Sequence, residues 1–505
     1  MTQELRPLAP GFPLWEARGL RQSSVLGATA LALLTLARLA VATRTGLMSD
    51  EAYYWDWSRH LAPSYFDHPP MVAYLIRLST AVLGDGTLAV HLPAIVLGAL
   101  SALVLRRLVL QLYPQRQGLA WAAALSLCVV PLFAQGQMFT TPDAPLVFFS
   151  LCALSLLHDA LNGRRAGWYG AGVAAGLALL SKFNAVLLVL VMVAYCSFTP
   201  EHRRWLRRPE PYLALTVAAA FTLPVLVWNA EHGWASLSFQ FVERHRRHFT
   251  PALNLTRLLA SQLTLSPQIL LLCLYGGWYG RQRARAGDAA ARWLLWFGAG
   301  LVGFFAIAGI FTLTLANWFE LGWALLLVLG LAGLSTTRLR RGVAWAVVGS
   351  AGALTAGVLF QAATQRFPIP RRLNYTAESY GWDAAGTRLR QLIAASPDPR
   401  RTFVFSRRFQ YSAQAAFAVP EATVTRVGGR RDQYDVWRRT DQLTGADAVF
   451  LDDDEFPAGP PPGLFERCEA AGELPITMGS RTVRTFRFWR CLQLDPARLP
   501  PSASR

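Results

Sequence analysis

Residues 25–43 read VLGATALALLTLARLAVAT, and residues 49–70, SDEAYYWDWSRHLAPSYFDHPP, follow almost at once. The first stretch is apolar and has a length that spans a bilayer as a helix, which takes roughly 17–25 residues. The second stretch mixes acidic side chains with aromatic rings. Carboxylates are expensive inside lipid, so the role of this second stretch depends on the side of a membrane on which it lies.

Apolar runs of this kind recur through the first 360 residues, and only 16% of the chain is charged, against about a quarter in soluble domains. The sequence therefore predicts an α-helical polytopic membrane protein with about 11 transmembrane helices. The runs are 25–43, 88–112, 119–135, 144–161, 168–180, 185–199, 211–228, 258–279, 291–315, 318–335 and 342–362.

The first run is interpreted as a signal anchor. It is longer than the usual apolar region of a signal peptide, about 7–15 residues, and no small-x-small cleavage site follows it before Asp50.

The net charge of +18 is explained by orientation, so no nucleic-acid partner is expected. With a cytoplasmic N-terminus and eleven spans, the arginine clusters between the spans fall on the inner side, as the positive-inside rule requires. These clusters are Arg18 and Arg21, Arg106 and Arg107, Arg164 and Arg165, Arg203 to Arg208, Arg281 to Arg285, and Arg338 to Arg341.

The same span count predicts which segments lie on the outer face, the periplasmic side of a bacterial inner membrane. These are 44–86, 136–143, 181–184, 229–257, 316–317 and the tail after about 362. We expect a transmembrane domain over 1–362 and a small C-terminal periplasmic α/β domain over 363–505, because the tail has a helical pattern and short strand-like groups. The helix is expected at 375–395 and the strands at 402–406, 422–427, 446–452 and 481–489.

The cysteines divide between the two parts of the chain. Four lie in predicted spans and are interpreted as small apolar packing residues. Cys468 and Cys491 lie in the outer tail, where oxidation is possible, so a disulfide between them is a hypothesis.

Several common signatures are missing from the sequence. It contains no GxxxxGK[ST] motif, no strand-linked GxGxxG and no zinc-type cluster of Cys and His. If the chain is an enzyme, its activated substrate is therefore not expected to be a nucleotide handled in water.

Asp50 and Glu51 stand where the first helix leaves the membrane. Partial burial at such a boundary raises the pKa of a carboxyl group, which suits a general base. The neighbouring rings Tyr53, Tyr54, Trp55 and Trp57 are expected at the headgroup level and are candidates, with Asp67 and His68, to line a substrate route. The alternative is an interfacial turn with solvated acids.

Asp143 lies in QMFTTPDAPLVFF (137–149), at a predicted outer hairpin between two spans. It is a second catalytic candidate if this hairpin packs against Asp50. The alternative is that Asp143 caps the helix that follows, because Asp is a favoured N-cap residue.

Lys182 is the only lysine, in LALLSKFNAVLLVL (177–190), so the other 48 of the 49 basic residues are arginine. An isolated cation at membrane depth is a candidate functional residue, and an ammonium group is a compact partner for a phosphate. The alternative is an anchor that extends its amine to the membrane surface.

FVERHRRHF (241–249) breaks the charge rule, because it places positive charge on the outer side. Arg244, Arg246 and Arg247 are therefore candidates to bind an anionic lipid phosphate. An exposed loop with a run of charges is the alternative.

Six motifs in this order resemble the bacterial GT-C glycosyltransferases of the protein-mannosyltransferase-like type, which include aminoarabinose and galacturonic-acid transferases that act on lipid A. The resemblance covers roughly residues 25–335. The motifs are DEAYYW, YFDHPPM, TPDAPL, LLSKFNAVLL, NAEHGWASLSFQFVER and ANWFELGW.

This resemblance implies a sugar donor on a polyprenyl phosphate and an acceptor in the cell envelope. It assigns Asp50 as the base with Glu51 beside it, Asp143 as a second acid and Lys182 as a contact of the donor phosphate. The aminoarabinose transferases tend to have a basic residue and Tyr after Asp-Glu, whereas Ala52 and Tyr53 follow here, so the sugar is not assigned.

The sequence therefore predicts a hexosyl or pentosyl transferase in the bacterial inner membrane that modifies lipid A, lipopolysaccharide or another envelope glycan by inverting transfer. No cofactor is expected, and this chemistry does not require a divalent metal. The alternatives are a protein O-mannosyltransferase, which uses a similar donor, and a transporter or flippase for lipid-linked sugars. A transporter would need ionisable residues along a path through the helices, and an inverted repeat is common.

Overall fold

The structure is a computed structural model that describes residues 20–243, 250–437, 440–495 and 497. It divides into two compact units. The helical unit comprises the residues up to Leu39, His68–Met71 and Leu92–Ala356, and the sheet unit comprises Ala40–Asp67, Val72–His91 and Gly357–Arg505.

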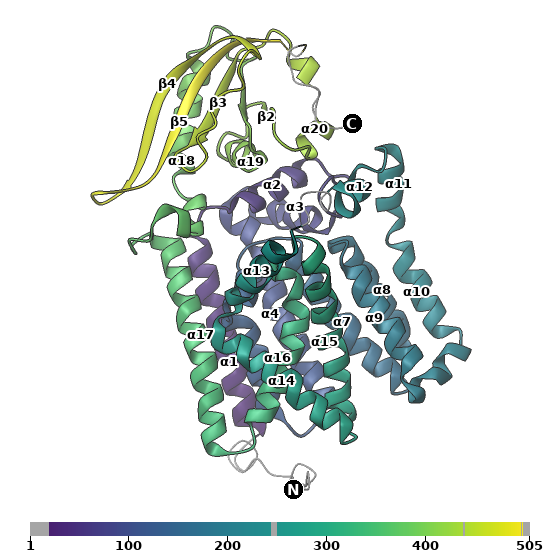
Figure 1. Ribbon diagram of the computed structural model, residues 1–505. Coiled ribbons are helices and arrows are strands. Elements are labelled where there is room, and N and C mark those ends of the chain that lie inside the picture. The colour runs from purple at the N-terminus through teal and green to yellow at the C-terminus, as the bar shows by residue number, and fades with distance from the viewer. Residues whose placement is uncertain (1–19, 244–249, 438–439, 496, 498–505) are drawn as a thin grey trace. The chain divides into compact units, whose positions relative to one another are not determined.

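The helical unit is a bundle of long apolar helices (Figure 1). Most residues of the following helices belong to it: α1 (Leu20–Ala42), α4 (Thr87–Leu112), α5 (Gln117–Val129), α6 (Pro131–Gly136), α7 (Asp143–Leu161), α8 (Ala166–Ser181), α9 (Ala185–Phe198), α10 (Glu210–Ala220), α11 (Leu223–Glu231), α12 (Ala235–Phe241), α13 (Pro251–Gln262), α14 (Pro267–Arg285), α15 (Ala289–Phe311), α16 (Glu320–Leu334) and α17 (Arg338–Thr364). Short 3-10 turns join some of them, including η1 (Pro200–Arg207) and η4 (Ala316–Phe319).

Within the described residues, 7 helical segments have the length and apolar composition to cross a membrane, and the number rises to 9 if each of two bent helix pairs forms one span. Shorter apolar helices, among them α5 and α8, coincide with two more of the predicted runs. The chain is therefore a multi-pass membrane protein, and the count of eleven spans stays a prediction.

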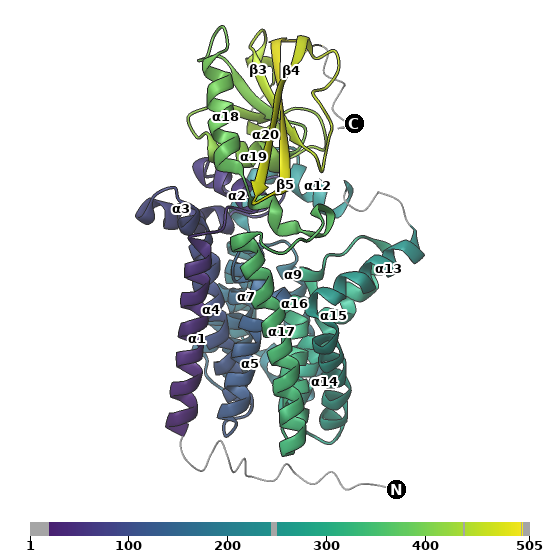
Figure 2. The ribbon, with the colours of Figure 1, turned by 90° about the vertical axis from the view of Figure 1, so that its left-hand side faces the viewer.

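Small residues allow close packing at the centre of the helical unit, where α16 lies beside α14 and α15 (Figure 2). A Cβ added at Gly276 of α14 would lie 2.1 Å from the backbone oxygen of Leu326 in α16, and one at Gly330 would lie 2.4 Å from that of Leu272. Glycine is therefore required at both positions, as is common where membrane helices approach closely.

The sheet unit contains a five-stranded mixed sheet of order β2-β1-β3-β5-β4. Strands β1, β2 and β3 are parallel, whereas β5 pairs antiparallel with both β3 and β4. The strands are β1 (Phe403–Ser406), β2 (Val424–Arg426), β3 (Ala448–Asp453), β4 (Phe465–Met478) and β5 (Arg481–Leu494). The helices of this unit are α2 (Ser49–Arg59), α3 (Met71–Leu83), α18 (Trp382–Ala394), α19 (Phe409–Ala418) and α20 (Gln433–Trp437), with short turns η5 (Arg371–Leu373), η6 (Tyr375–Ser379) and η7 (Thr440–Leu443).

Alternate residues of the strands bury opposite faces of the sheet, as the period of two requires. Val404 of β1 and Val449 of β3 join the apolar core that α18 and α19 complete, and α2 packs on α19. Their strand neighbours Phe403, Phe405 and Phe450 join a separate apolar cluster on the other face. Helix α2 is therefore packed on α19, which in turn packs on the sheet.

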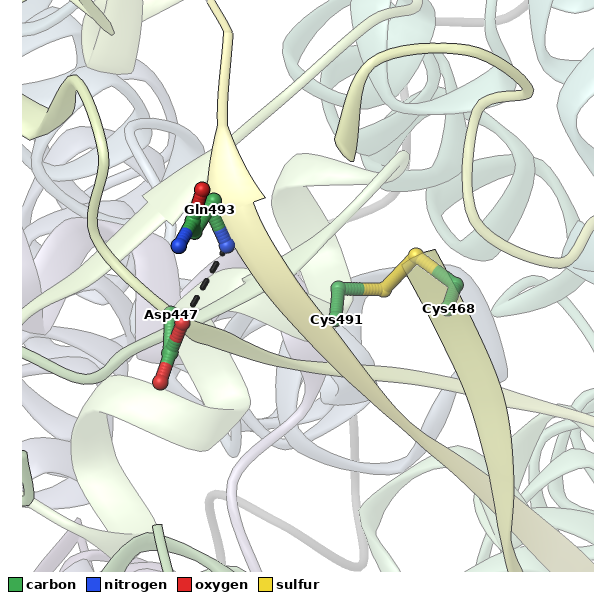
Figure 3. Close-up of a disulfide and its surroundings, with 4 residues drawn as sticks. All are labelled: Asp447, Cys468, Cys491 and Gln493. Carbon is green, nitrogen blue, oxygen red and sulfur yellow. Dashed lines mark hydrogen bonds between the residues drawn. A yellow bond between two sulfur atoms is a disulfide. The ribbon is translucent and has the colours of Figure 1, made fainter. Parts of the chain in front are cut away.

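The disulfide hypothesis is confirmed: Cys468 of β4 and Cys491 of β5 form a disulfide (Figure 3). The two residues stand directly opposite each other in the antiparallel register, with their Cα atoms 4.1 Å apart. Close to this bridge, the backbone N–H of Gln493 donates to Asp447. These links fix β5 to its neighbours on both sides.

Candidate functional site

The first carboxylate of interest, Asp50, lies in the first turn of α2. Two acidic side chains accept the unpaired N–H groups at this end of the helix. Glu51 Oε2 accepts from the backbone of Met48 at 3.0 Å, and Glu378 Oε1 accepts from the backbone of Ser49 at 2.7 Å. Because the first N–H groups of a helix lack partners inside it, these contacts fix the turn that carries Asp50.

Glu51 is held by a histidine as well. His91 Nδ1 lies 2.8 Å from Glu51 Oε1, and both side chains are completely buried. The other ring nitrogen, Nε2, lies 3.3 Å from the backbone oxygen of Thr45. Both ring nitrogens thus face acceptors, so the pair is best satisfied when His91 carries two protons. Glu51 is therefore held in place by His91 and by the backbone of Met48, and its catalytic role stays a prediction.

Asp50 is exposed to water when the whole residue is considered, whereas its carboxylate is crowded by protein groups. Loss of hydration raises the pKa of Asp50 to about 7. Repulsion from Glu378, Asp67 and Glu51 acts in the same direction, and Arg430 opposes it. Because three nearby charges and desolvation agree, the upward direction of the pKa shift does not depend on burial alone. A carboxyl group that titrates near pH 7 is well suited to general base catalysis.

Asp67 is the centre of a buried polar network. Its carboxylate accepts from the Tyr53 hydroxyl at 3.0 Å and from Arg430 Nη2 at 2.8 Å. The Tyr53 hydroxyl in turn accepts from the backbone N–H of Gln433 at 2.8 Å. Arg430 therefore forms an ion pair with Asp67. Of the four acids Asp50, Glu51, Asp67 and Glu378, Asp50 is the one whose side chain makes no hydrogen bond among the described residues.

The four aromatic candidates of α2 are all buried in the core of the sheet unit. Trp57 stacks on Tyr65 with ring centres 4.3 Å apart, and the ring centres of Tyr53 and of Phe409 in α19 lie 4.5 Å apart. Trp55 donates through its indole to Asp85 at 3.2 Å. The structure thus gives these rings, including Tyr54, a packing role, and a route for substrate along them stays a prediction.

Two parts of the predicted site cannot be joined to this group. His68 is partly buried and begins the segment His68–Met71, which belongs to the helical unit. Arg244, Arg246 and Arg247 lie outside the described residues. The roles proposed for these residues stay predictions.

The second group lies in the helical unit and joins two candidates that the sequence separates by 39 positions. Lys182 Nζ lies 2.6 Å from Asp143 Oδ1, and each side chain is only 8% exposed. Asn317 Nδ2 donates to the other oxygen of Asp143 at 2.7 Å. Asp143 stands in the first turn of α7, and Lys182 follows the end of α8.

Glu320 adds a further buried acid to this group. It begins α16, is 5% exposed and interacts electrostatically with Asp143 and Lys182. A Cβ added at Gly136 would lie 3.5 Å from Glu320 Oε1, an ordinary contact that places this carboxylate beside the end of α6. An ammonium carries three N–H donors, and Asp143 uses one of them. The arrangement can therefore hold Lys182 in place while leaving it able to donate to a phosphate.

Sequence reasoning missed Arg430, Glu378 and His91. Arg430 and Glu378 lie more than 300 residues from α2, and His91 is one polar residue inside an apolar run. The available signals were the histidine within a span and the adjacent Arg430 and Arg431 after two glycines, but neither signal names its partner. Among the described residues, no three His, Cys, Asp or Glu side chains come together as a metal site.

Comparison with known proteins first gives a family and a fold to which the chain is similar. Residues 67–228 match the family described as dolichyl-phosphate-mannose-protein mannosyltransferase. The crystal structure of ArnT from Cupriavidus metallidurans matches 92% of this chain and 98% of its own length with a TM-score of 0.63 and 16% identity. These matches confirm the GT-C glycosyltransferase resemblance that the motifs indicate, and they show that the two chains share a fold.

Two relatives found by sequence have names that state the sugar that they transfer. The lipid A galacturonosyltransferase RgtD of Rhizobium johnstonii is 28% identical over 54% of this chain and 58% of its own length. The undecaprenyl phosphate-alpha-4-amino-4-deoxy-L-arabinose arabinosyl transferase of Pseudomonas aeruginosa is 35% identical over 34% of this chain and 32% of its own. The chain therefore matches little more than half of the first of these relatives and about a third of the second.

Proposed function

We propose that this chain is an inner-membrane glycosyltransferase that moves a sugar from a polyprenyl phosphate to an envelope glycolipid such as lipid A. The observation that carries the proposal is the carboxyl group of Asp50, which lies among three other acids that help raise its pKa to about 7, on a helix end that two of those acids fix. The relatives support the substrate classes. RgtD is named for transfer to lipid A, and a structure of ArnT is described as bound to undecaprenyl phosphate.

In the proposed reaction, the oxygen of an acceptor hydroxyl attacks the anomeric carbon of the sugar while Asp50 takes the hydroxyl proton. The bond between that carbon and the phosphate oxygen breaks, and the electron pair leaves with the polyprenyl phosphate. Attack opposite the leaving group inverts the configuration. Lys182 stabilises the charge of the departing phosphate, with Arg244, Arg246 and Arg247 as further proposed contacts.

The proposal includes a topology. The N-terminus lies in the cytoplasm, eleven helices cross the membrane, and the domain after residue 362 lies in the periplasm with the reaction. We expect a membrane-impermeant reagent to label a single cysteine introduced at residue 400 in intact spheroplasts. Labelling only after the membrane is opened would contradict this orientation.

The function is tested by mass spectrometry of lipid A, core oligosaccharide and envelope proteins. A deletion strain is compared with strains that carry the wild type, Asp50→Asn or Asp85→Asn, where Asp85 is a surface acid that pairs with Arg59. One sugar mass is expected to disappear from a glycolipid on deletion, and wild type and Asp85→Asn restore it. Full restoration by Asp50→Asn would contradict the assignment of the base.

The family match favours one alternative, transfer to protein, because the matched family is described by protein mannosylation. The same experiment separates the two acceptors. Loss of a hexose from an envelope protein, with every glycolipid mass unchanged, would replace the glycolipid by a Ser or Thr acceptor.

A further inference from the structure

Four arginines gather where two parallel strands of the sheet unit end. Arg407 and Arg408 follow β1, and Arg430 and Arg431 follow β2 after a short turn. Because β1 and β2 are parallel neighbours, their carboxyl ends share one edge of the sheet, the edge at which open α/β sheets bind ligands. We call these four residues the arginine edge.

Two glycines bring the loops of this edge together. Gly428 and Gly429 have φ values of 81° and 86°, which other residues rarely adopt. A Cβ at Gly429 would lie 2.7 Å from the backbone oxygen of Arg407, and one at Gly428 would lie 3.9 Å from Arg407 Nε. The side chain of Arg407 therefore runs beside the turn that leads to Arg430.

Two of the four guanidinium groups have partners that hold them in place. Arg430 binds Asp67 and lies 4.8 Å from the ring centre of Phe409. Arg408 lies 3.5 Å from the ring centre of Phe456. These contacts make the edge a fixed structure.

The other two guanidinium groups face water. Arg407 and Arg431 are exposed, and the described part of the chain offers neither of them a carboxylate within ion-pair distance. Arg431 only covers the ring of Phe66, 5.7 Å from its centre. An arginine fork with free N–H groups matches a phosphate or a carboxylate bidentately, so the edge has the chemistry of an anion-binding surface.

We propose that the arginine edge binds the anionic groups of the glycolipid acceptor's headgroup, and that Arg407 and Arg431 supply the free contacts. The Arg430–Asp67 pair links this edge to the acids around Asp50, so an acceptor held at the edge presents its hydroxyl near the base. The inference rests on the proposed function. The donor phosphate has its own cation in Lys182, which leaves the edge to the acceptor.

The test measures acceptor and donor KM separately with purified protein in nanodiscs. The acceptors are lipid A and the same lipid A after enzymatic removal of its phosphates. The variants are Arg407→Ala/Arg431→Ala and the corresponding double Lys substitution. The control is Arg400→Ala, which changes an exposed arginine of the same unit whose side chain makes no hydrogen bond or ion pair among the described residues.

The expected result for the double Ala variant is a rise of roughly tenfold or more in acceptor KM, because two charge-assisted contacts are lost, with kcat and donor KM within about twofold of wild type. The acceptor KM of the double Lys variant should fall between those of wild type and the double Ala variant, since lysine keeps the positive charge and loses the bidentate guanidinium donors. Dephosphorylated lipid A raises the KM of wild type to the value of the variant, and Arg400→Ala matches wild type.

An unchanged acceptor KM in the double Ala variant would overturn the inference. So would a KM that follows the phosphatidylglycerol content of the nanodisc and ignores the phosphates of the acceptor, because the edge would then attract bulk lipid. Binding of lipid A without donor distinguishes the two proposals. If wild type binds it and the double variant does not, the edge stands even where no sugar is transferred and the proposed function fails.

Discussion

Asp50 and Asp143 occupy equivalent places in their helices and have opposite surroundings. Each stands in the first turn of a helix, α2 for Asp50 and α7 for Asp143. Asp143 is buried and has a cation on one oxygen and an amide on the other. Asp50 is exposed, has acids around it, and makes no hydrogen bond within the described residues.

The difference shows how one residue type serves two purposes. A carboxylate with both oxygens satisfied is stable as an anion and holds other groups in position. A carboxyl group that is crowded by like charge binds a proton more readily, and it can gain and lose that proton near neutral pH. We therefore propose that Asp50 transfers the proton and that Asp143 positions Lys182.

The largest expected effect is that of Asp50→Asn. An amide cannot accept the acceptor's proton, so kcat should fall by about 10²–10⁴-fold, the usual contribution of a general base. The amount of folded protein in the membrane should not change, because the Asp50 side chain makes no hydrogen bond or ion pair with the residues that the structure describes. Turnover assays on protein normalised by gel filtration check this. Activity within threefold of wild type would place the base elsewhere.

Lys182→Met tests the other half of the comparison. It leaves Asp143 buried without its cation, which should reduce the free energy of unfolding by about 3–5 kcal/mol. The double variant Asp143→Asn/Lys182→Met should regain part of this loss, because it removes the unpaired charge. Thermal unfolding in detergent measures both.

A surface pair in the same unit provides the control for this experiment. Arg107→Met breaks an ion pair with Asp159 in which the arginine is half exposed, so a change below about 1 kcal/mol is expected. If Asp143→Asn/Lys182→Met were less stable than Lys182→Met alone, the buried Asp143 carboxylate would not need Lys182 as its counter-charge.

The pH dependence of the wild type is the third test. The pKa of Asp50 is raised to about 7, and the base acts only after losing its proton. The rate should therefore fall roughly tenfold per pH unit below about pH 7 and level off above it. A rate that is flat down to pH 5 would show that Asp50 titrates at its ordinary pKa or takes no part.

Arg430→Gln should produce the smallest change, a shift of this acidic limb to higher pH. Arg430 lowers the pKa of Asp50, and its removal also breaks the ion pair with Asp67. The pH at half-maximal kcat should rise, while Arg400→Gln should leave it in place. A shift to lower pH would mean that Arg430 acts on Asp50 in another way.

The sequence was a good guide to the helices and to most strands. The apolar runs coincide with helices of the structure, and four predicted strands match β1, β2, β3 and β5. Strand β4 was missed because most of its side chains are polar or exposed. Its extended conformation is stabilised by pairing with β5, which the pattern of its own residues does not indicate. The helix expected at 375–395 is broken at Gly381, whose φ of 86° ends the helical path.

The candidate site was predictable in its residues and not in its contacts. Asp50, Asp143 and Lys182 stand out because charge is costly in apolar surroundings. That Lys182 pairs with Asp143, or that Arg430 pairs with Asp67, depends on tertiary packing between distant segments. The aromatic rings were expected at a membrane surface, yet the sheet unit buries them, because an aromatic run is equally suited to a protein core.

The single lysine of the chain has a practical consequence. Its ε-amine is the only one in the protein, and the ion pair with Asp143 shields it. Amine-directed dyes and crosslinkers should therefore react poorly with the lysine of the folded wild type and readily with that of Asp143→Asn. Reductive methylation with ¹³C-formaldehyde would place one lysine resonance at this position. Under the proposed role of Lys182, that resonance should shift when a phosphate binds to the intact membrane protein.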